Sequence, residues 1–183
     1  MEKRGRAAPE IRIERLEGAR ETEACARMMA ESEPWITLRR GYEGCLALLR
    51  SPDREVWVAR ADGRPVGFAV LVLRGAFVGY LQSLVVEPAL RGRGIGTRLL
   101  RFAEERILRE SPNVFVCVSS FNPGARRLYE RLGYREVGTL DDYIVPGHAE
   151  ILLRKTIGPI ASFRPRGGAD EEERTAGESE KEE

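Results

Sequence analysis

Residues 84–97 read Leu84-Val85-Val86-Glu87-Pro88-Ala89-Leu90-Arg91-Gly92-Arg93-Gly94-Ile95-Gly96-Thr97. The apolar first part predicts a strand that ends near residue 86, and the glycine-rich second part leads into a helix over about residues 97–109. The first N–H groups of a helix have no acceptor within the helix, and the positive end of its dipole lies there, so phosphate is attracted. Glycine permits close approach because it has no Cβ. We therefore predict an anion site at this loop, with Arg91, Arg93 and Arg98 adding positive charge.

Other sites with glycine-rich loops fit this sequence less well. A Rossmann dinucleotide site requires Gly-x-Gly-x-x-Gly after a first strand, but the third position after Gly96 is Leu99 and the motif lies mid-chain. A P-loop requires Gly-Lys followed by Ser or Thr, which the loop lacks. A plain strand-to-helix turn with solvated arginines is the remaining alternative.

Apolar periodicity predicts further elements on both sides of the loop. We expect strands over residues 11–16, 55–59, 65–73, 76–86, 113–118 and, in a final pair that begins at 137, 150–153. We expect helices over residues 22–30, 42–49, 97–109 and 122–132. Asp62-Gly63 predicts a hairpin turn between the second and third strands. The order of elements predicts an α/β fold around a mixed sheet.

The length of 183 residues and the 42% hydrophobic content fit one domain. We expect a flexible segment over residues 1–10, the domain over 11–163 and an acidic disordered tail over 164–183. Residues 167–183 hold eight acidic and two basic side chains and sum to −6, which leaves +7 on residues 1–166 of a chain with net charge +1. The basic body suits an anionic ligand. Its modest, dispersed charge argues against nucleic acid as a partner.

The three cysteines, Cys25, Cys45 and Cys117, are far apart and show no Cys-x-x-Cys pattern. We expect buried reduced thiols, with neither a disulfide framework nor a metal site. The apolar runs are far shorter than the roughly 20 residues that span a bilayer, so we expect no membrane partner. The charged first ten residues do not resemble a secretory signal, and we expect a cytoplasmic protein.

Two motifs resemble the GNAT superfamily of N-acetyltransferases. The first is residues 84–88 running into 91–96, and the second is Asn122 with Ala125-Arg126-Arg127-Leu128-Tyr129-Glu130-Arg131-Leu132-Gly133-Tyr134. The resemblance covers roughly residues 11–157. It implies the GNAT fold: a mixed, mostly antiparallel central sheet of six to seven strands with about four helices. It also implies that the strand ending at Val86 splays from the strand over 113–118, with the pantetheine arm of the cofactor in the gap.

The resemblance further implies acetyl-CoA as co-substrate. Backbone groups of the strand before the loop would bind the pantetheine amides and polarise the thioester carbonyl, and the loop would hold the pyrophosphate. The side chain of Asn122 would touch the cofactor arm, although an Asn before Pro-Gly is also an ordinary helix N-cap. The implied cofactor-binding residues are Leu84, Val85, Val86, Arg91, Gly92, Arg93, Gly94, Ile95, Gly96, Thr97 and Asn122.

Tyr129 lies where the family often places its general acid. A phenol with a pKa near ~10 is protonated at neutral pH and can donate a proton to the departing thiolate. The alternative is a core tyrosine packed beside Leu128 and Leu132.

The general base is left open. In relatives that acetylate protein N-termini it is a Glu on the strand equivalent to residues 113–118, and the matching position here is Cys117. The candidates are water or one of four side chains, Glu33, Asp141, Asp142 and His148. Trp35, Tyr42 and Tyr143 are candidates for the wall of an acceptor site. A covalent route through Cys117 is not expected, because no sequence neighbour would lower the pKa of its thiol.

The function implied is transfer of an acetyl group from acetyl-CoA to a primary amine, by direct attack in a ternary complex. The acceptor is a small molecule or a protein N-terminus, and the fold alone does not distinguish between them. The alternative is a non-catalytic acyl-CoA-binding sensor or partner-binding module. Homodimer formation stays open.

Overall fold

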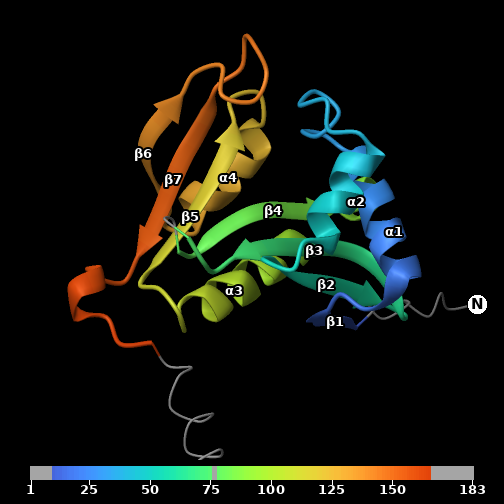
Figure 1. Ribbon diagram of the computed structural model, residues 1–183, viewed down its shortest axis with the longest axis horizontal. Coiled ribbons are helices and arrows are strands. Elements are labelled where there is room, and N and C mark those ends of the chain that lie inside the picture. The colour runs from blue at the N-terminus through green and yellow to red at the C-terminus, as the bar shows by residue number, and fades with distance from the viewer. Residues whose placement is uncertain (1–9, 76–77, 166–183) are drawn as a thin grey trace, which may run out of the picture.

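A seven-stranded sheet forms the centre of the computed structural model, which describes residues 10–75 and 78–165 (Figure 1). The strands are β1 (Ile11–Arg15), β2 (Glu55–Ala61), β3 (Arg64–Val72), β4 (Tyr80–Val86), β5 (Asn113–Ser119), β6 (Arg135–Leu140) and β7 (Glu150–Thr156). Their order across the sheet is β1-β2-β3-β4-β5-β7-β6. β4 and β5 run parallel, and every other pair of neighbours is antiparallel. The predicted α/β fold with a mixed, mostly antiparallel sheet is confirmed.

Helices cover both faces of the sheet. They are α1 (Gly18–Ala30), α2 (Tyr42–Arg50), α3 (Ile95–Ile107) and α4 (Pro123–Arg131), with 3-10 turns at Pro88–Leu90 and Ile160–Ser162. Successive residues of β3 point to opposite faces, as a pleated strand requires. Phe68 and Val70 join the core formed with α1 and α2, whereas Ala69 and Leu71 join the core formed with α3. The sheet is therefore buried on both sides at its centre.

The starts of β4 and α3 differ from the predictions, in each case at a glycine, whereas the predicted hairpin is confirmed. The fourth strand is predicted over residues 76–86, but β4 begins at Tyr80, because Gly79 has φ +91° and lies in a turn. Residues 76–77 of that prediction lie outside the described residues. Helix α3 begins at Ile95 rather than at residue 97, since Gly94 takes the N-cap position with φ +82°. In the predicted hairpin, Asp62 and Gly63 have φ of +50° and +78°, as a type I′ turn requires.

The two central strands separate soon after they meet. β4 and β5 pair at Tyr80–Phe115 and Leu81–Val116, and no later pair follows between them within the described residues. Between β3 and β4 the register passes from Val70–Ser83 to Leu71–Leu81, so Gln82 has no opposite residue. Such a bulge bends a strand and increases its twist. Figure 1 shows β4 and β5 diverging, which is the splay that the sequence motifs implied.

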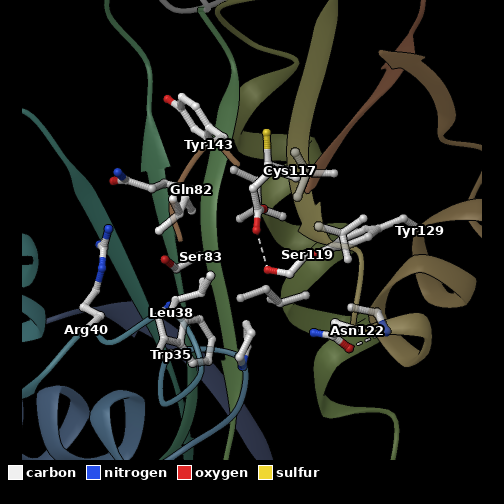
Figure 2. A pocket seen from close by; sticks show the side chains of 18 of the residues that line it. Trp35, Leu38, Arg40, Gln82, Ser83, Cys117, Ser119, Asn122, Tyr129 and Tyr143 are labelled. Carbon is white, nitrogen blue, oxygen red and sulfur yellow. Dashed lines mark hydrogen bonds between the residues drawn. The ribbon is translucent and has the colours of Figure 1, made fainter. Parts of the chain in front are cut away.

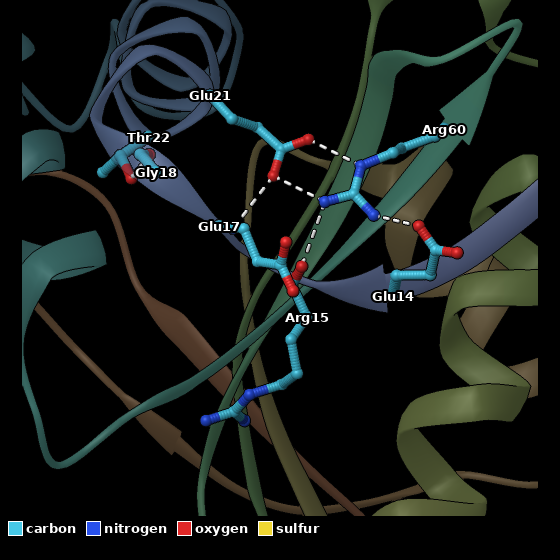
Figure 3. Close-up of polar contacts among 7 residues, drawn as sticks. All are labelled: Glu14, Arg15, Glu17, Gly18, Glu21, Thr22 and Arg60. Atoms are coloured by element: carbon cyan, nitrogen blue, oxygen red, sulfur yellow. Dashed lines mark hydrogen bonds and ion pairs between the residues drawn. The ribbon is translucent and has the colours of Figure 1, made fainter.

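Helix α1 is attached to the sheet by an arginine in β2. Nε and NH2 of Arg60 donate to the two carboxylate oxygens of Glu21 at 2.7 and 2.8 Å, and NH1 pairs with Glu14 of β1 (Figure 3). The Glu21 carboxylate also accepts from the N–H of Glu17 at the start of α1. Although burial raises the pKa of Glu21, the hydrogen bonds from Arg60 and Glu17 lower it overall. This network fixes the helix layer that leads into residues 31–40.

The ends of the chain bear on two predictions. Residues 1–9 and 166–183, which hold most of the predicted flexible segment and acidic tail, lie outside the described residues. The boundaries of the domain at 11 and 163 remain predictions. No helix in the described ranges is long and apolar enough to cross a membrane.

Candidate functional site

Two cavities lie at the gap between β4 and β5. The loop cavity, about 640 Å³, lies against the glycine-rich loop and the start of α3. The strand cavity, about 510 Å³, lies between the parted strands (Figure 2). Both are lined by Pro34, Trp35, Leu84, Asn122, Ala125 and Tyr129. A ligand can therefore extend from one cavity into the other past Tyr129.

The loop cavity holds the helix N-terminus predicted to bind an anion. The first hydrogen bond within α3 runs from the N–H of Arg98 to the carbonyl of Gly94 at 3.0 Å, so the N–H groups of residues 95–97 have no acceptor in the helix. Gly92 and Gly94 have φ of +76° and +82°, a conformation that disfavours other residues. The loop is thus shaped by glycine to present free backbone donors to the cavity.

The predicted loop residues divide into two groups. Arg91, Gly92, Gly94, Gly96 and Thr97 line the loop cavity, whereas Arg93 and Ile95 do not appear in its lining. Ile95 is buried in the core and can offer only its backbone. The Arg91 guanidinium donates to the carbonyls of Val86 and Glu33 at 3.2 and 3.4 Å, so it fixes the loop to the end of β4 and the 31–40 segment.

The side chains of the predicted strand residues point alternately toward the cavities and into the core. Leu84 lines both cavities and Val86 lines the loop cavity, while the side chain of Val85 is fully buried on the opposite face. Beyond Leu81, the edge of β4 that faces β5 has no strand partner. A linear ligand with amide groups can add to this edge as a strand would.

Helix α4 supplies the two residues predicted from the second motif. Asn122 is its N-cap, and Oδ1 accepts from the N–H of Ala125 at 3.2 Å, which leaves the amide nitrogen without a partner among the described residues. Tyr129 is 5% exposed, and its ring meets Tyr134 edge to face with centroids 5.5 Å apart. Its hydroxyl bonds to no described residue, and burial raises its pKa. The phenol is therefore protonated at neutral pH and free to donate into the cavities.

The strand cavity contains three polar residues that the sequence did not indicate, Gln82, Ser119 and Glu150. Figure 2 shows Cys117 and Ser119 of β5 with Tyr143 above them, while the amide of Gln82 on β4 points away from them. Oε1 of Gln82 accepts from Nε of Arg54 at 2.6 Å. Glu150, the first residue of β7, accepts a short hydrogen bond from Ser119 Oγ. It is only 4% exposed but lines the cavity. No sequence motif indicates Glu150, because a single Glu at the start of an apolar strand is not part of a recognisable pattern.

Cys117 differs from the prediction of a buried thiol. Cys25 and Cys45 are buried as expected, but Cys117 is half-buried and lines the strand cavity, because β5 has lost its neighbour β4 there. Burial and the charge of Glu150 raise the pKa of Cys117, and a hydrogen bond with Tyr80 lowers it by less. The thiol is therefore protonated at neutral pH.

The four candidate bases are placed unevenly. Glu33 lines the loop cavity, where its carboxylate accepts from the N–H and hydroxyl of Thr37. The other three line neither cavity. Asp141 is exposed, Asp142 accepts from the N–H of Gly147 at 2.6 Å, and His148 packs on Phe121 with ring centroids 4.7 Å apart.

The aromatic residues predicted to wall an acceptor site are also divided. Trp35 and Tyr143 line the strand cavity, whereas Tyr42 does not and instead lies under the guanidinium of Arg27. Among the described residues, no group of three or more His, Cys, Asp and Glu side chains is placed to hold a metal ion.

A family model described as the acetyltransferase (GNAT) family matches residues 16–134. The chain belongs to this GNAT family. RimI of Mycobacterium tuberculosis (strain ATCC 25618 / H37Rv), an N-alpha-acetyltransferase, is 30% identical over 150 residues, which are 80% of this chain and 90% of that protein. N-acetylaspartate synthetase of Xenopus tropicalis is 31% identical over 58% of this chain. The chain spans 40% of the length of this synthetase.

The GNAT fold is also seen in solved structures. The crystal structure of an aminoglycoside 6'-N-acetyltransferase complexed with coenzyme A has a TM-score of 0.65 at 21% identity, and the match covers 80% of this chain and 97% of that one. At this identity the likeness concerns the fold alone. The predicted GNAT fold is confirmed by the family match and by this likeness.

Proposed function

We propose that this GNAT chain transfers an acetyl group from acetyl-CoA to a primary amine of a small molecule or a protein N-terminus. The transfer occurs by direct attack of the amine in a ternary complex. One observation carries the proposal: a cavity at free helix N–H groups joins a second cavity between parted strands, and Tyr129 lines both. This arrangement provides one binding site for a cofactor and another for an acceptor.

The loop cavity suits the diphosphate of CoA. The N–H groups of residues 95–97 and the positive end of α3 favour bound anions, and the loop glycines leave room for them. The unpaired edge of β4 then takes the pantetheine amides, and a backbone N–H on this edge polarises the thioester carbonyl. The free amide nitrogen of Asn122 adds a donor for the same arm. The solved GNAT neighbour with coenzyme A is consistent with this cofactor.

Tyr129 acts as the general acid in this proposal. It lies at the junction of the cavities, where the sulfur of the thioester would lie between cofactor and acceptor. Its raised pKa keeps the proton available until the thiolate leaves. Cys117 does not form an acyl intermediate, because its thiol remains protonated.

The strand cavity favours an acceptor that carries an acidic group as well as the amine. Arg40 lines its wall, and no hydrogen bond or ion pair holds the guanidinium to another described residue (Figure 2). A free guanidinium is suited to bind a carboxylate. Glu150 is the one carboxylate in the described lining of this cavity, so a polycationic amine would find little compensation for its charge.

Thiol release from acetyl-CoA tests the proposal, measured with the full chain over a panel of amines. The panel includes amino acids, peptides with free N-termini, polyamines and aminoglycosides. We expect turnover with at least one amine, and faster turnover with amines that carry a carboxylate. Calorimetry with acetyl-CoA is run in parallel. Binding of acetyl-CoA without turnover on any amine would instead support the non-catalytic acyl-CoA-binding module.

A further inference from the structure

We propose that Glu150 is the catalytic group that takes the proton from the attacking amine. This inference rests on the proposed acetyl transfer and assigns the base that the sequence left open. It places the base on β7, a strand that contributes no other residue to either cavity within the described lining.

The sheet register brings Glu150 to the reaction side of β5. Its Cα lies opposite Ser119, and Leu152 lies opposite Cys117. Because side chains alternate between faces along a strand, Glu150, Ser119 and Cys117 share the face that lines the strand cavity. Ser119 Oγ donates to Oε1 of Glu150, while Oε2 bonds to no described residue. One carboxylate oxygen is thus positioned and the other is free to accept a proton.

Among the described residues, Glu150 shares the strand cavity with one other charged side chain, that of Arg40. Tyr80 from β4, Cys117 from β5 and Tyr143 from the segment before β7 line the same cavity. Burial raises the pKa values of Tyr80 and Cys117, and the charge of Glu150 adds to the rise. Arg40 lies on the cavity wall but forms no ion pair with Glu150. A carboxylate that is neither paired with a cation nor solvated is a stronger base than an exposed one.

Burial raises the pKa of Glu150, and the hydrogen bond from Ser119 offsets only part of that effect. A base works best when its pKa approaches the operating pH, since it is then ionised and still binds a proton well. Three other titratable groups of the strand cavity hold their protons more tightly. Burial raises the pKa values of Tyr80, Tyr129 and Cys117, so none of them is an anion at neutral pH.

The proposed step balances without another reactant. The amine nitrogen bonds to the acetyl carbon, and the proton that the nitrogen loses moves to Oε2 of Glu150. The carbon–sulfur bond then breaks, and the thiolate takes the proton of Tyr129. The products are the N-acetylated acceptor and CoA thiol. Glu150 later passes its proton to water and Tyr129 regains one, which restores both groups.

The direct test is Glu150→Gln, which keeps the shape and the possible hydrogen bond with Ser119 but removes the proton acceptor. We expect kcat to fall about 100-fold, the size typical of general base catalysis, with little change in KM or in acetyl-CoA affinity. The acidic limb of the kcat–pH profile should also disappear. The matched control is Glu136→Gln, an exposed carboxylate on β6 that pairs with Arg126, and it should keep wild-type turnover.

Ser119→Ala is the second variant, and it tests the assignment of Glu150 as the base even if Glu150→Gln fails to fold. Ser119 lowers the pKa of Glu150, so its removal should move the acidic limb to higher pH while kcat at alkaline pH is retained. An unshifted limb, wild-type turnover in Glu150→Gln, or a rise in KM without a fall in kcat would each overturn the assignment. Should the wild-type chain bind acetyl-CoA but acetylate no amine, the proposed function itself fails, and the assignment with it.

Discussion

Gly79 and Asn113 are in contact where β4 and β5 come together, so closely that a Cβ on Gly79 would lie 2.2 Å from the carbonyl oxygen of Asn113. The carbonyl of Gly79 accepts from the N–H of Phe115 at 2.9 Å. This contact fixes the start of the only parallel pairing among the described strands. The gap that holds both cavities opens from this point.

Gly79→Ala should therefore destabilise the fold strongly. The methyl group would clash with backbone at Asn113 and with Ile107, and φ of +91° disfavours alanine in addition. We expect a loss of about 3 kcal/mol or more in the free energy of unfolding, measured with denaturant. Gly75→Ala is the control, because Gly75 has φ +96° but nothing within 4 Å of a Cβ. An equal loss in both variants would show that the contact is unimportant.

Gly96→Ala should weaken acetyl-CoA binding without unfolding the chain. A Cβ there would be 3.5 Å from Val86 and 4.0 Å from Leu128, which are ordinary contacts, but it would project toward the loop cavity. We expect at least a tenfold higher Kd, equivalent to about 1.4 kcal/mol, by calorimetry. Gly44→Ala, on an exposed part of α2, should leave the affinity unchanged. Wild-type affinity in Gly96→Ala would place the diphosphate elsewhere.

Tyr129→Phe should lower kcat about 100-fold and leave the acetyl-CoA affinity unchanged, because only the donated proton is lost. Steady-state kinetics and calorimetry measure the two quantities. Tyr134→Phe is the control, since its ring packs on Tyr129 but its hydroxyl lies beside Glu104 and lines neither cavity. If Tyr129→Phe turns over like the wild type, another group protonates the thiolate.

The pair of Arg60 and Glu21 should make stability depend on acid pH. The folded-state pKa of Glu21 is lowered, so its contribution is present above its ordinary value of 4.5 and is lost as the pH falls through the folded value. Arg60→Met should cost about 1.5 kcal/mol at pH 7, because it removes the charged hydrogen-bond donor of the half-buried Glu21 carboxylate. The difference from wild type should shrink below pH 4 in denaturant titrations. A difference that is constant with pH would contradict this role.

The contribution of Glu150 to stability should change with pH in the opposite direction to that of Glu21. Its folded-state pKa is raised, so the protonated form is compatible with the fold and the ionised form is destabilising. The stabilising contribution is complete below the ordinary value of 4.5 and is lost as the pH rises through the folded value. Glu150→Gln should accordingly be more stable than wild type at pH 8 and nearly equal to it at pH 4, by thermal unfolding. Lower stability at pH 8 would mean that the carboxylate is needed by the fold.

Local patterns along the chain were sufficient for most of the fold and for the loop side of the candidate site. Gly92, Gly94 and Gly96 predict a helix start with free N–H groups, and Asn122 followed by Pro123 predicts the start of the next helix. These signals are local, because they depend on neighbouring residues and backbone conformation. Both helices begin where such signals place them, within two residues. The length of β4 was overestimated because Gly79 interrupts an otherwise strand-like sequence.

The acceptor side of the site depended on contacts between distant residues. Glu150 and Ser119 are 31 residues apart and meet because β7 inserts between β5 and β6. No local periodicity encodes that strand order. The sequence therefore gave no reason to prefer Glu150 as the base over loop residues such as Asp141, Asp142 and His148. The sequence alone thus specified most elements and the glycine-rich helix start, whose free N–H groups belong to consecutive residues. Strand order and register determined which buried carboxylate faces the gap, since burial and neighbouring charge arise only when separate strands pack together.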